Sequence, residues 1–258
     1  MISNLSRWSL ARIGRRLLRT IPVQLKESSP VDWGEAQRLA HDMDEYSLGM
    51  KALNRLNSPL KLIPNSANQL EVHMAQFNPE WREIYPYAFR NFVEPVAGTV
   101  EIDPFLVLSL MRAESLYSED ARSGVGAQGL MQIMPFTAVR IARMMGDYSF
   151  RLSELQQPFV NIAYGSYYVK CLTSYYRGNL PLAVAAYNGG PTSVNRWLEQ
   201  YGTLEMDEFI ETIPFKETRN YVKSVLRNFN HYKHIWQQSS AVASLPVAPN
   251  GNTGSEIF

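Results

Sequence analysis

One glutamate, Glu114, follows a long apolar stretch and could serve as an acid catalyst. Residues 105–111 read FLVLSLM, and the chain continues as Arg112-Ala113-Glu114-Ser115. If this stretch is a helix, Glu114 lies near its C-terminal end, where burial and the helix dipole both disfavour a charged carboxylate. Both effects raise the pKa of Glu114, as a general acid working near neutral pH requires. Position alone favours a plainer role, a helix-end glutamate paired with a nearby arginine.

A glycine-rich segment, GVGAQG at residues 124–129, matches the G-x-G-x-x-G pattern of dinucleotide-binding loops. That pattern needs a preceding strand and a following helix in a βαβ unit. Here the polar turn SEDARS at residues 118–123 precedes it, so the match is accidental. We expect a loop in which the backbone approaches a ligand or a packed helix.

Two further segments carry polar side chains that could bind a ligand beside Glu114. The segment GLMQIMP at residues 129–135 places Gln132 and Met134 in a groove wall, with core packing at a helix entrance as the alternative. The segment AYNGGP at residues 186–191 ends one helix and begins another. Tyr187 and Asn188 at that corner offer a phenol and an amide for sugar hydroxyl or N-acetyl groups. The alternative there is a hydrogen-bonded helix cap.

The charged residues and the histidines narrow the choice of partner and cofactor. The chain has 25 Lys and Arg against 24 Asp and Glu, so charge gives no case for nucleic acid as a partner. A single cysteine, Cys171, excludes an internal disulfide and a cysteine-based zinc site. His231 and His234 have neither a third ligand nor HExxH spacing. We therefore expect no metal and no cofactor. Glu211 is by default an ion-pair partner of Arg219 or Lys223.

The elements that must position these residues are predicted to be helical. Asp103-Pro104 forms a helix start, with Asp as N-cap and Pro at the first helical position. No run alternates with period two, so the predicted fold class is all-α. The expected helices are a hairpin within residues 33–60, one helix over 79–96, the helix that starts at Asp103, and helices over about 135–145, 158–177, 181–188, 191–201 and 214–237.

The chain divides by composition into four predicted parts. Residues 1–30 form a basic segment with five arginines and no acidic residue before residue 26. The arginines interrupt every apolar run, which argues against a secretory signal and indicates a solvated helix or arm, with membrane-surface contact as the alternative. Residues 31–69 hold the helical hairpin and a linker, residues 70–237 the main domain, and residues 238–258 a disordered tail. No run approaches the length of a transmembrane helix.

Four segments, taken together and in order, resemble the catalytic domain of the soluble lytic transglycosylases, relatives of goose-type lysozyme. The matching residues are Glu114-Ser115; Ser123 with 129–135; 185–191 with Arg196-Trp197; and Ile213-Pro214 with 217–219 and Tyr221-Val222. The resemblance covers about Leu70 to Tyr232. It implies a lysozyme-like helical catalytic domain over residues 70–237, preceded by a short helical hairpin. Relatives usually carry a proline where this chain has Glu119, which affects a loop rather than the acid.

The resemblance also implies an activity. Family members cleave the β-1,4 bond between N-acetylmuramic acid and N-acetylglucosamine in peptidoglycan, and the muramoyl C6 hydroxyl attacks C1 to leave a 1,6-anhydro end. By similarity, Glu114 is the single acid and base. The implied substrate-binding residues are Ser115, Ser123, Gln132, Met134, Tyr187, Asn188, Glu211 and Tyr221.

The sequence leaves two other functions open. The expected cellular location follows only from the expected substrate. A hydrolytic lysozyme would use the same Glu114 with a captured water and a second carboxylate. A non-catalytic glycan-binding or helical interaction protein is the other alternative. The expected partners are peptidoglycan glycan strands and proteins of cell-wall synthesis. The expected state is a monomer in the cell envelope, in the periplasm.

Overall fold

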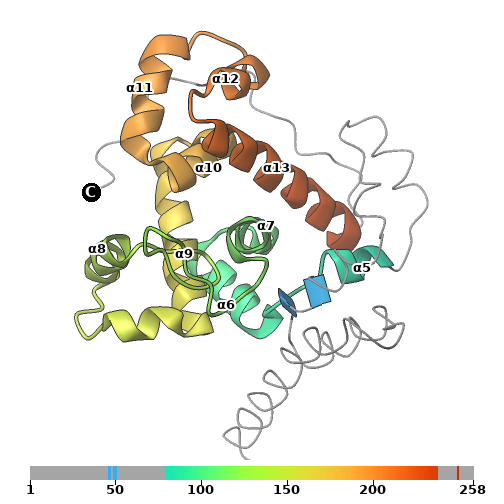
Figure 1. Cartoon of the computed structure of the whole chain (residues 1–258), viewed down its shortest axis with the longest axis vertical. Coiled ribbons are helices and arrows are strands. Elements are labelled where there is room, and N and C mark those ends of the chain that lie inside the picture. The colour runs from blue at the N-terminus through green and yellow to red at the C-terminus, as the bar shows by residue number, and fades with distance from the viewer. Residues whose placement is uncertain (1–45, 48, 51–79, 238–248, 250–258) are drawn as a thin grey trace, which may run out of the picture. The chain divides into compact units, whose positions relative to one another are not determined.

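The computed structural model describes residues 46, 47, 49, 50, 80–237 and 249 (Figure 1). The chain divides into two compact units, residues 1–88 and 89–258. Most of the predicted hairpin and tail, together with the basic segment and the linker, lies outside the described residues. Tyr46, Ser47, Gly49 and Met50 are helical. The four-part division of the chain stays a prediction.

The described part of the second unit is helical, which confirms the predicted all-α fold class. Among the described residues there is no β-strand, only isolated bridges that join Gln128 to Arg122 and to Ile133. The elements are α6 (Arg90–Val100), α7 (Pro104–Ser115), α8 (Pro135–Met145), the 3-10 helix η2 (Leu152–Gln156), α9 (Pro158–Tyr175), α10 (Leu180–Gly189), α11 (Pro191–Tyr201), α12 (Met206–Thr212) and α13 (Lys216–Gln237).

Helix α7 lies in the centre of this unit. Its start is the predicted one, because the Asp103 carboxylate accepts a hydrogen bond from the backbone N–H of Phe105 at 2.9 Å and Pro104 occupies the first turn. Every residue over 105–112 is buried. The helix packs against α13, α6 and α9, and is seen nearly end on between them in Figure 1. Its C-terminal end, with Glu114, is therefore held from several sides.

Helix α10 brings a second polar corner against α13. It packs on α9, α11 and α13, and residues 181–186 are all buried. Its last residue, Gly189, approaches α13 so closely that a Cβ there would lie 3.0 Å from Thr218 Oγ1 and 3.2 Å from the Trp197 ring. The absence of a side chain at Gly189 thus lets the 187–188 corner meet the first turns of α13.

One helix prediction was wrong in its extent, and one short helix was not predicted. The single helix expected over residues 79–96 is interrupted: α5 spans Glu80–Ile84 and α6 begins at Arg90. Pro86 explains the break, because proline lacks the N–H that a helix needs and disfavours helical backbone in the residue before it. The sequence also missed α12, whose seven residues (Met206–Thr212) are too few for a clear periodic pattern.

Candidate active site

Glu114 lies in the last turn of α7, and the chain reverses directly after it. Leu116 and Tyr117 both have left-handed backbone, with φ of 49° and 63°. Ser115 ties this end of the helix to the 129–134 loop, because its Oγ donates a hydrogen bond to the carbonyl oxygen of Leu130 at 2.8 Å. Glu114 is partly exposed. Within the described part of the chain it forms no ion pair, so the arginine partner that position alone favours is not found there.

The hydrogen-bond partner of Glu114 is a tyrosine on the last helix. The Tyr221 hydroxyl donates to Glu114 Oε1 at 2.6 Å. Burial raises the pKa of Glu114 from 4.5 to about 7; the bond from Tyr221 opposes the rise, and the negative charge of Glu217 adds to it. A carboxyl with this pKa is substantially protonated near neutral pH and is suited to donate a proton to a leaving oxygen.

Tyr187 reaches the same region from the end of α10. Its hydroxyl donates to the carbonyl oxygen of Met131 at 2.8 Å, and its ring lies 5.4 Å from that of Tyr168 on α9, centroid to centroid. Burial, and next the charge of Glu114, raise the pKa of both the Tyr187 and Tyr221 phenols well above the ordinary value. Both phenols therefore keep their protons and act as hydrogen-bond donors.

Asn188 is oriented by α13. Its Oδ1 accepts a hydrogen bond from Thr218 Oγ1 at 2.6 Å, which fixes which end of the amide faces the helix. Among the described residues, no hydrogen bond is made by the amide nitrogen. That N–H pair is therefore available to a carbonyl acceptor such as an acetamido oxygen.

A buried asparagine holds the 128–133 loop in place. Asn161 on α9 is 1% exposed. Its Oδ1 accepts from the backbone N–H of Met131 at 2.8 Å, and its Nδ2 donates to the carbonyl oxygens of Gln128 at 2.9 Å and Leu155 at 2.8 Å. Gly129, with φ of 77°, passes so close to this amide that a Cβ would overlap it. The glycine predicted to allow a close backbone approach meets a packed helix.

The remaining predicted residues of this loop have largely internal contacts. Gln132 Nε2 donates to the carbonyl oxygens of Gly129 at 2.8 Å and Ala121 at 3.1 Å. Ser123 Oγ accepts from the backbone N–H of Ala127 at 2.9 Å, which closes the turn. Met134 precedes the first residue of α8 and is 39% exposed. Substrate contact by these residues stays a prediction.

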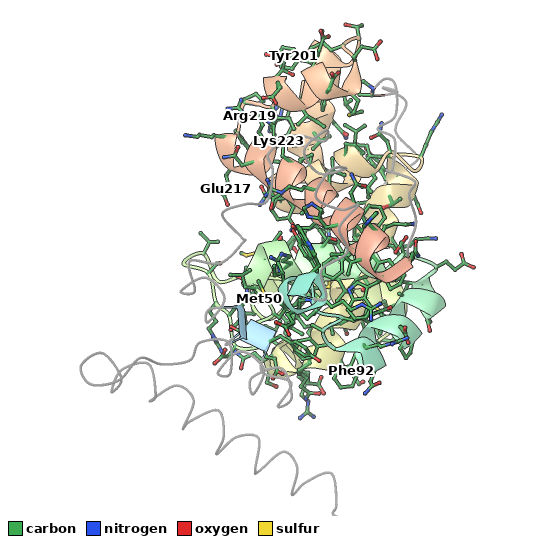
Figure 2. The ribbon with its side chains drawn as sticks, turned by 90° about the vertical axis from the view of Figure 1, so that its right-hand side faces the viewer. Met50, Phe92, Tyr201, Glu217, Arg219 and Lys223 are labelled. Carbon is green, nitrogen blue, oxygen red and sulfur yellow. The ribbon has the colours of Figure 1, made fainter. Side chains whose placement is uncertain are left out.

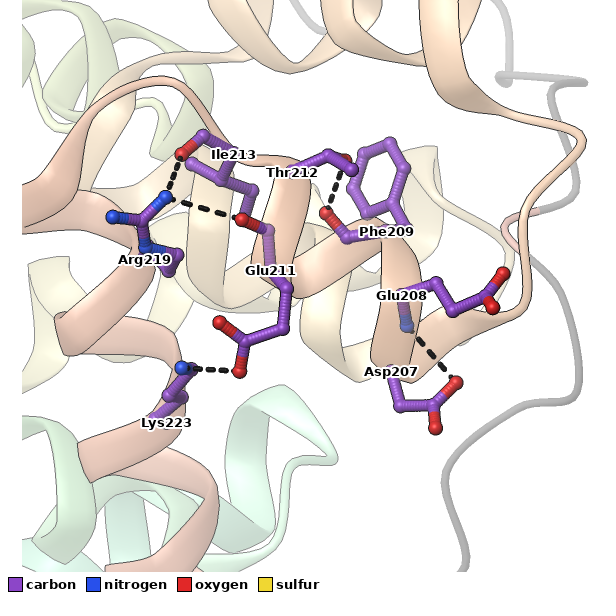
Figure 3. Close-up of polar contacts among 8 residues, drawn as sticks. All are labelled: Asp207, Glu208, Phe209, Glu211, Thr212, Ile213, Arg219 and Lys223. Carbon is purple, nitrogen blue, oxygen red and sulfur yellow. Dashed lines mark hydrogen bonds and ion pairs between the residues drawn. The ribbon is translucent and has the colours of Figure 1, made fainter.

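Glu211 forms one of the two ion pairs that were expected for it from the sequence. Its carboxylate pairs with Lys223 of α13, and both side chains are largely exposed (Figure 3). Arg219 instead binds the backbone: its Nη1 donates to the carbonyl oxygens of Glu211 and Ile213, each at 3.1 Å. These bonds satisfy carbonyl groups at the C-terminal end of α12. Figure 2 shows Glu217, Arg219 and Lys223 along the same helix.

Sequence reasoning did not identify the roles of Asn161, Thr218 and Glu217. Asn161 carries a usable signal, because a polar residue in the apolar run FVNIA of a predicted buried helix must find hydrogen-bond partners. Thr218 and Glu217 belong to the segment singled out before the last helix. Nothing in that segment alone says that one of them bonds Asn188 and the other acts on Glu114.

Comparison with known proteins identifies the family. Residues 93–210 match the model of the transglycosylase SLT domain, and residues 212–241 match that of the soluble lytic transglycosylase helical domain. The soluble lytic murein transglycosylase of Salmonella typhimurium is 30% identical over 222 residues, which cover 85% of this chain and 33% of that protein.

Two solved structures are similar in fold. An inactive Glu-to-Gln mutant of the lytic transglycosylase Slt from Pseudomonas aeruginosa has a TM-score of 0.66 and 33% identity, covering 81% of this chain and 31% of that one. The 70 kDa soluble lytic transglycosylase from Escherichia coli has a TM-score of 0.70 and 28% identity, covering 89% and 34%. The chain spans about a third of the length of these relatives. The fold is the predicted lysozyme-like helical one and both family models match, so the chain belongs to the soluble lytic transglycosylase family.

Proposed function

We propose that this protein is a peptidoglycan lytic transglycosylase that cleaves the β-1,4 bond between N-acetylmuramic acid and N-acetylglucosamine. The observation that carries the proposal is Glu114: a carboxyl with a pKa of about 7, partly exposed and bonded to the Tyr221 hydroxyl. Glu114 protonates the leaving oxygen as the C1–O bond breaks. The muramoyl C6 hydroxyl then attacks C1 and returns a proton to Glu114, so the 1,6-anhydro product forms without water.

The polar groups around Glu114 suit the rest of this reaction. The Thr218 hydroxyl donates a hydrogen bond to the amide oxygen of Asn188, so the amide N–H groups face away from Thr218. They are suited to hold the substrate acetamido oxygen beside the oxocarbenium-like centre. The Tyr221 phenol keeps its proton and donates a hydrogen bond to Glu114, which favours a transition state that gains negative charge on Glu114.

A hydrolytic lysozyme is the second candidate, and Glu217 is the observation in its favour. Glycosidases that add water across the bond use two carboxylates. Glu217 is an exposed carboxylate whose charge acts on Glu114. The relatives are named transglycosylases, which favours the intramolecular route.

The deciding experiment is mass analysis of the sugar fragments released from purified peptidoglycan. Fragments one water lighter than reducing disaccharide-peptides are expected from the wild type, and none from Glu114→Gln. Glu199→Gln, which changes an exposed carboxylate on α11, serves as the matched control and should release wild-type amounts. Ordinary reducing ends would establish a lysozyme, and full activity in Glu114→Gln would overturn the role of Glu114.

The place of action and the partners belong to the same proposal. The relatives act on murein by name and include soluble and membrane-bound enzymes. We propose action in the cell envelope, in the periplasm, on glycan strands, by a monomer that works with proteins of cell-wall synthesis. In the part of the chain that the structure describes, no helix combines the length and the apolar character needed to cross a membrane.

A further inference from the structure

Two tyrosines that no motif of the sequence includes meet between α7 and α13. The hydroxyl groups of Tyr117 and Tyr232 form a hydrogen bond. Both side chains are almost fully buried, at 2% and below 1% exposed. The Tyr232 ring also stacks on Phe105, with centroids 6.2 Å apart and ring planes 11° from parallel. Because Phe105 lies in the first turn of α7 and Tyr117 follows its last turn, the Tyr117 side chain runs back along the helix.

The backbone at Tyr117 is constrained to make this contact. Leu116 and Tyr117 are consecutive non-glycine residues with left-handed backbone, immediately after Glu114-Ser115. Such residues are costly and persist only where their surroundings hold them. The buried ring of Tyr117 and its bond to Tyr232 supply that hold. The reversal that ends the helix of Glu114 is thus coupled to a residue near the far end of α13.

Tyr221 and Tyr232 face α7 from the same side of α13. They are eleven residues apart, which is three helical turns and about 16 Å along the axis. Tyr221 bonds Glu114 at the C-terminal end of α7, whereas Tyr232 and Lys233 meet Phe105 and the Asp103 carboxylate at its N-terminal end. A slide of α13 along α7 would therefore change the Tyr221–Glu114 distance.

We infer that Tyr117 is a positioning residue: through Tyr232 it fixes the axial register of α13 against α7 and so holds Tyr221 at hydrogen-bonding distance from Glu114. The consequence for the reaction rests on the proposed function. The consequence for Glu114 does not, because loosening the bond from Tyr221 removes an interaction that stabilises the carboxylate.

The test is Tyr117→Phe, which removes one hydroxyl and keeps the ring. Because the Tyr221 bond lowers the pKa of Glu114, the variant should have a higher Glu114 pKa. The alkaline limb of its pH–rate profile should move to higher pH. We expect kcat to fall about threefold to tenfold with KM nearly unchanged, since misplacement of a catalytic group slows the chemical step. In the Tyr117→Phe/Tyr221→Phe double variant, the pKa shift should be no larger than in Tyr221→Phe alone.

Tyr176→Phe is the matched control. Tyr176 is also buried, at 3% exposed, and its hydroxyl bonds Asn195 and the carbonyl oxygen of Pro191, both on α11. It should lose stability without moving the Glu114 pKa. Should Tyr117→Phe fail to fold, Tyr232→Phe removes the other hydroxyl and carries the same expectation.

Direct titration of the Glu114 carboxyl by NMR, compared among these variants, separates this inference from the activity. A raised pKa in Tyr117→Phe supports the inference even if the wild type cleaves no peptidoglycan. An unchanged Glu114 pKa, or a shift that adds fully to that of Tyr221→Phe, overturns it and leaves Tyr117 a core residue only.

Discussion

The Tyr221 hydroxyl donates a 2.6 Å hydrogen bond to Oε1 of Glu114, across 107 residues of chain. The bond acts against burial, which raises the pKa of the same carboxyl to about 7. One phenol thus sets both the orientation of Glu114 and how readily it gives up its proton.

Tyr221→Phe should raise the pKa of Glu114, because the carboxylate loses a donor that stabilises its charged form. An acid catalyst works while protonated, so the alkaline limb of activity should move to higher pH. The maximal rate should fall about tenfold, as expected for loss of a hydrogen bond to a charged group. Peptidoglycan cleavage measured from pH 5 to 9 checks both effects. A limb that moves toward acid would contradict the assignment.

Glu217→Gln should act in the opposite direction. It removes the negative charge that raises the pKa of Glu114, so the alkaline limb should move to lower pH. Because Glu217 is exposed, salt screens its charge. The difference between the alkaline limbs of the wild type and Glu217→Gln should therefore shrink as the salt concentration rises. Glu199→Gln on α11 is the control and should leave the limb in place. Equal limbs in the wild type and Glu217→Gln at low salt would show that this charge does not reach Glu114.

Glu114→Gln should stabilise the protein at alkaline pH. A carboxyl pKa raised by folding means that the folded state binds more protons than the unfolded state, so stability falls as pH rises from about 4.5 to 7. The rise corresponds to a cost of about 3 kcal/mol above pH 7, which the neutral amide avoids.

Denaturant unfolding of both proteins at pH 4.5 and pH 8 provides the measurement. The difference in unfolding free energy between the two proteins should be near zero at pH 4.5 and approach about 3 kcal/mol at pH 8. Buried His231, whose pKa is lowered to about 3, destabilises the fold as pH falls below 6.5, but it does so equally in both proteins. A difference independent of pH would mean that the pKa of Glu114 is not raised.

Asn161→Ala should destabilise the protein by about 3 kcal/mol, because the backbone N–H of Met131 loses its acceptor and the carbonyl oxygens of Gln128 and Leu155 each lose a donor. The 128–133 loop carries the carbonyl oxygen that Tyr187 bonds, so cleavage should also fall at temperatures where the variant stays folded. Asn195→Ala removes amide bonds to two tyrosines elsewhere and should lose stability alone. Thermal unfolding and cleavage rates of both variants give the comparison, and wild-type cleavage by Asn161→Ala would exclude a role for the loop in the site.

Local sequence patterns predict much of the fold. Asp103-Pro104 marks the start of α7, the apolar run after it predicts burial on all sides, and proline and glycine fix α8, α9 and α11 to within a few residues. These features depend on backbone chemistry within one or two turns. The position of Glu114 at the end of a buried helix follows from them, and with it the direction of its pKa shift.

Tertiary structure alone decided which residues act on Glu114. Tyr221 and Glu217 lie more than a hundred positions away in sequence, and helical periodicity does not say which neighbour a face will meet. The same holds for Tyr117 and Tyr232, which are joined because α13 runs back along α7. Local propensity selects the helices, whereas the packing of α7 against α13 brings the charges and hydroxyl groups of the site within reach of one another.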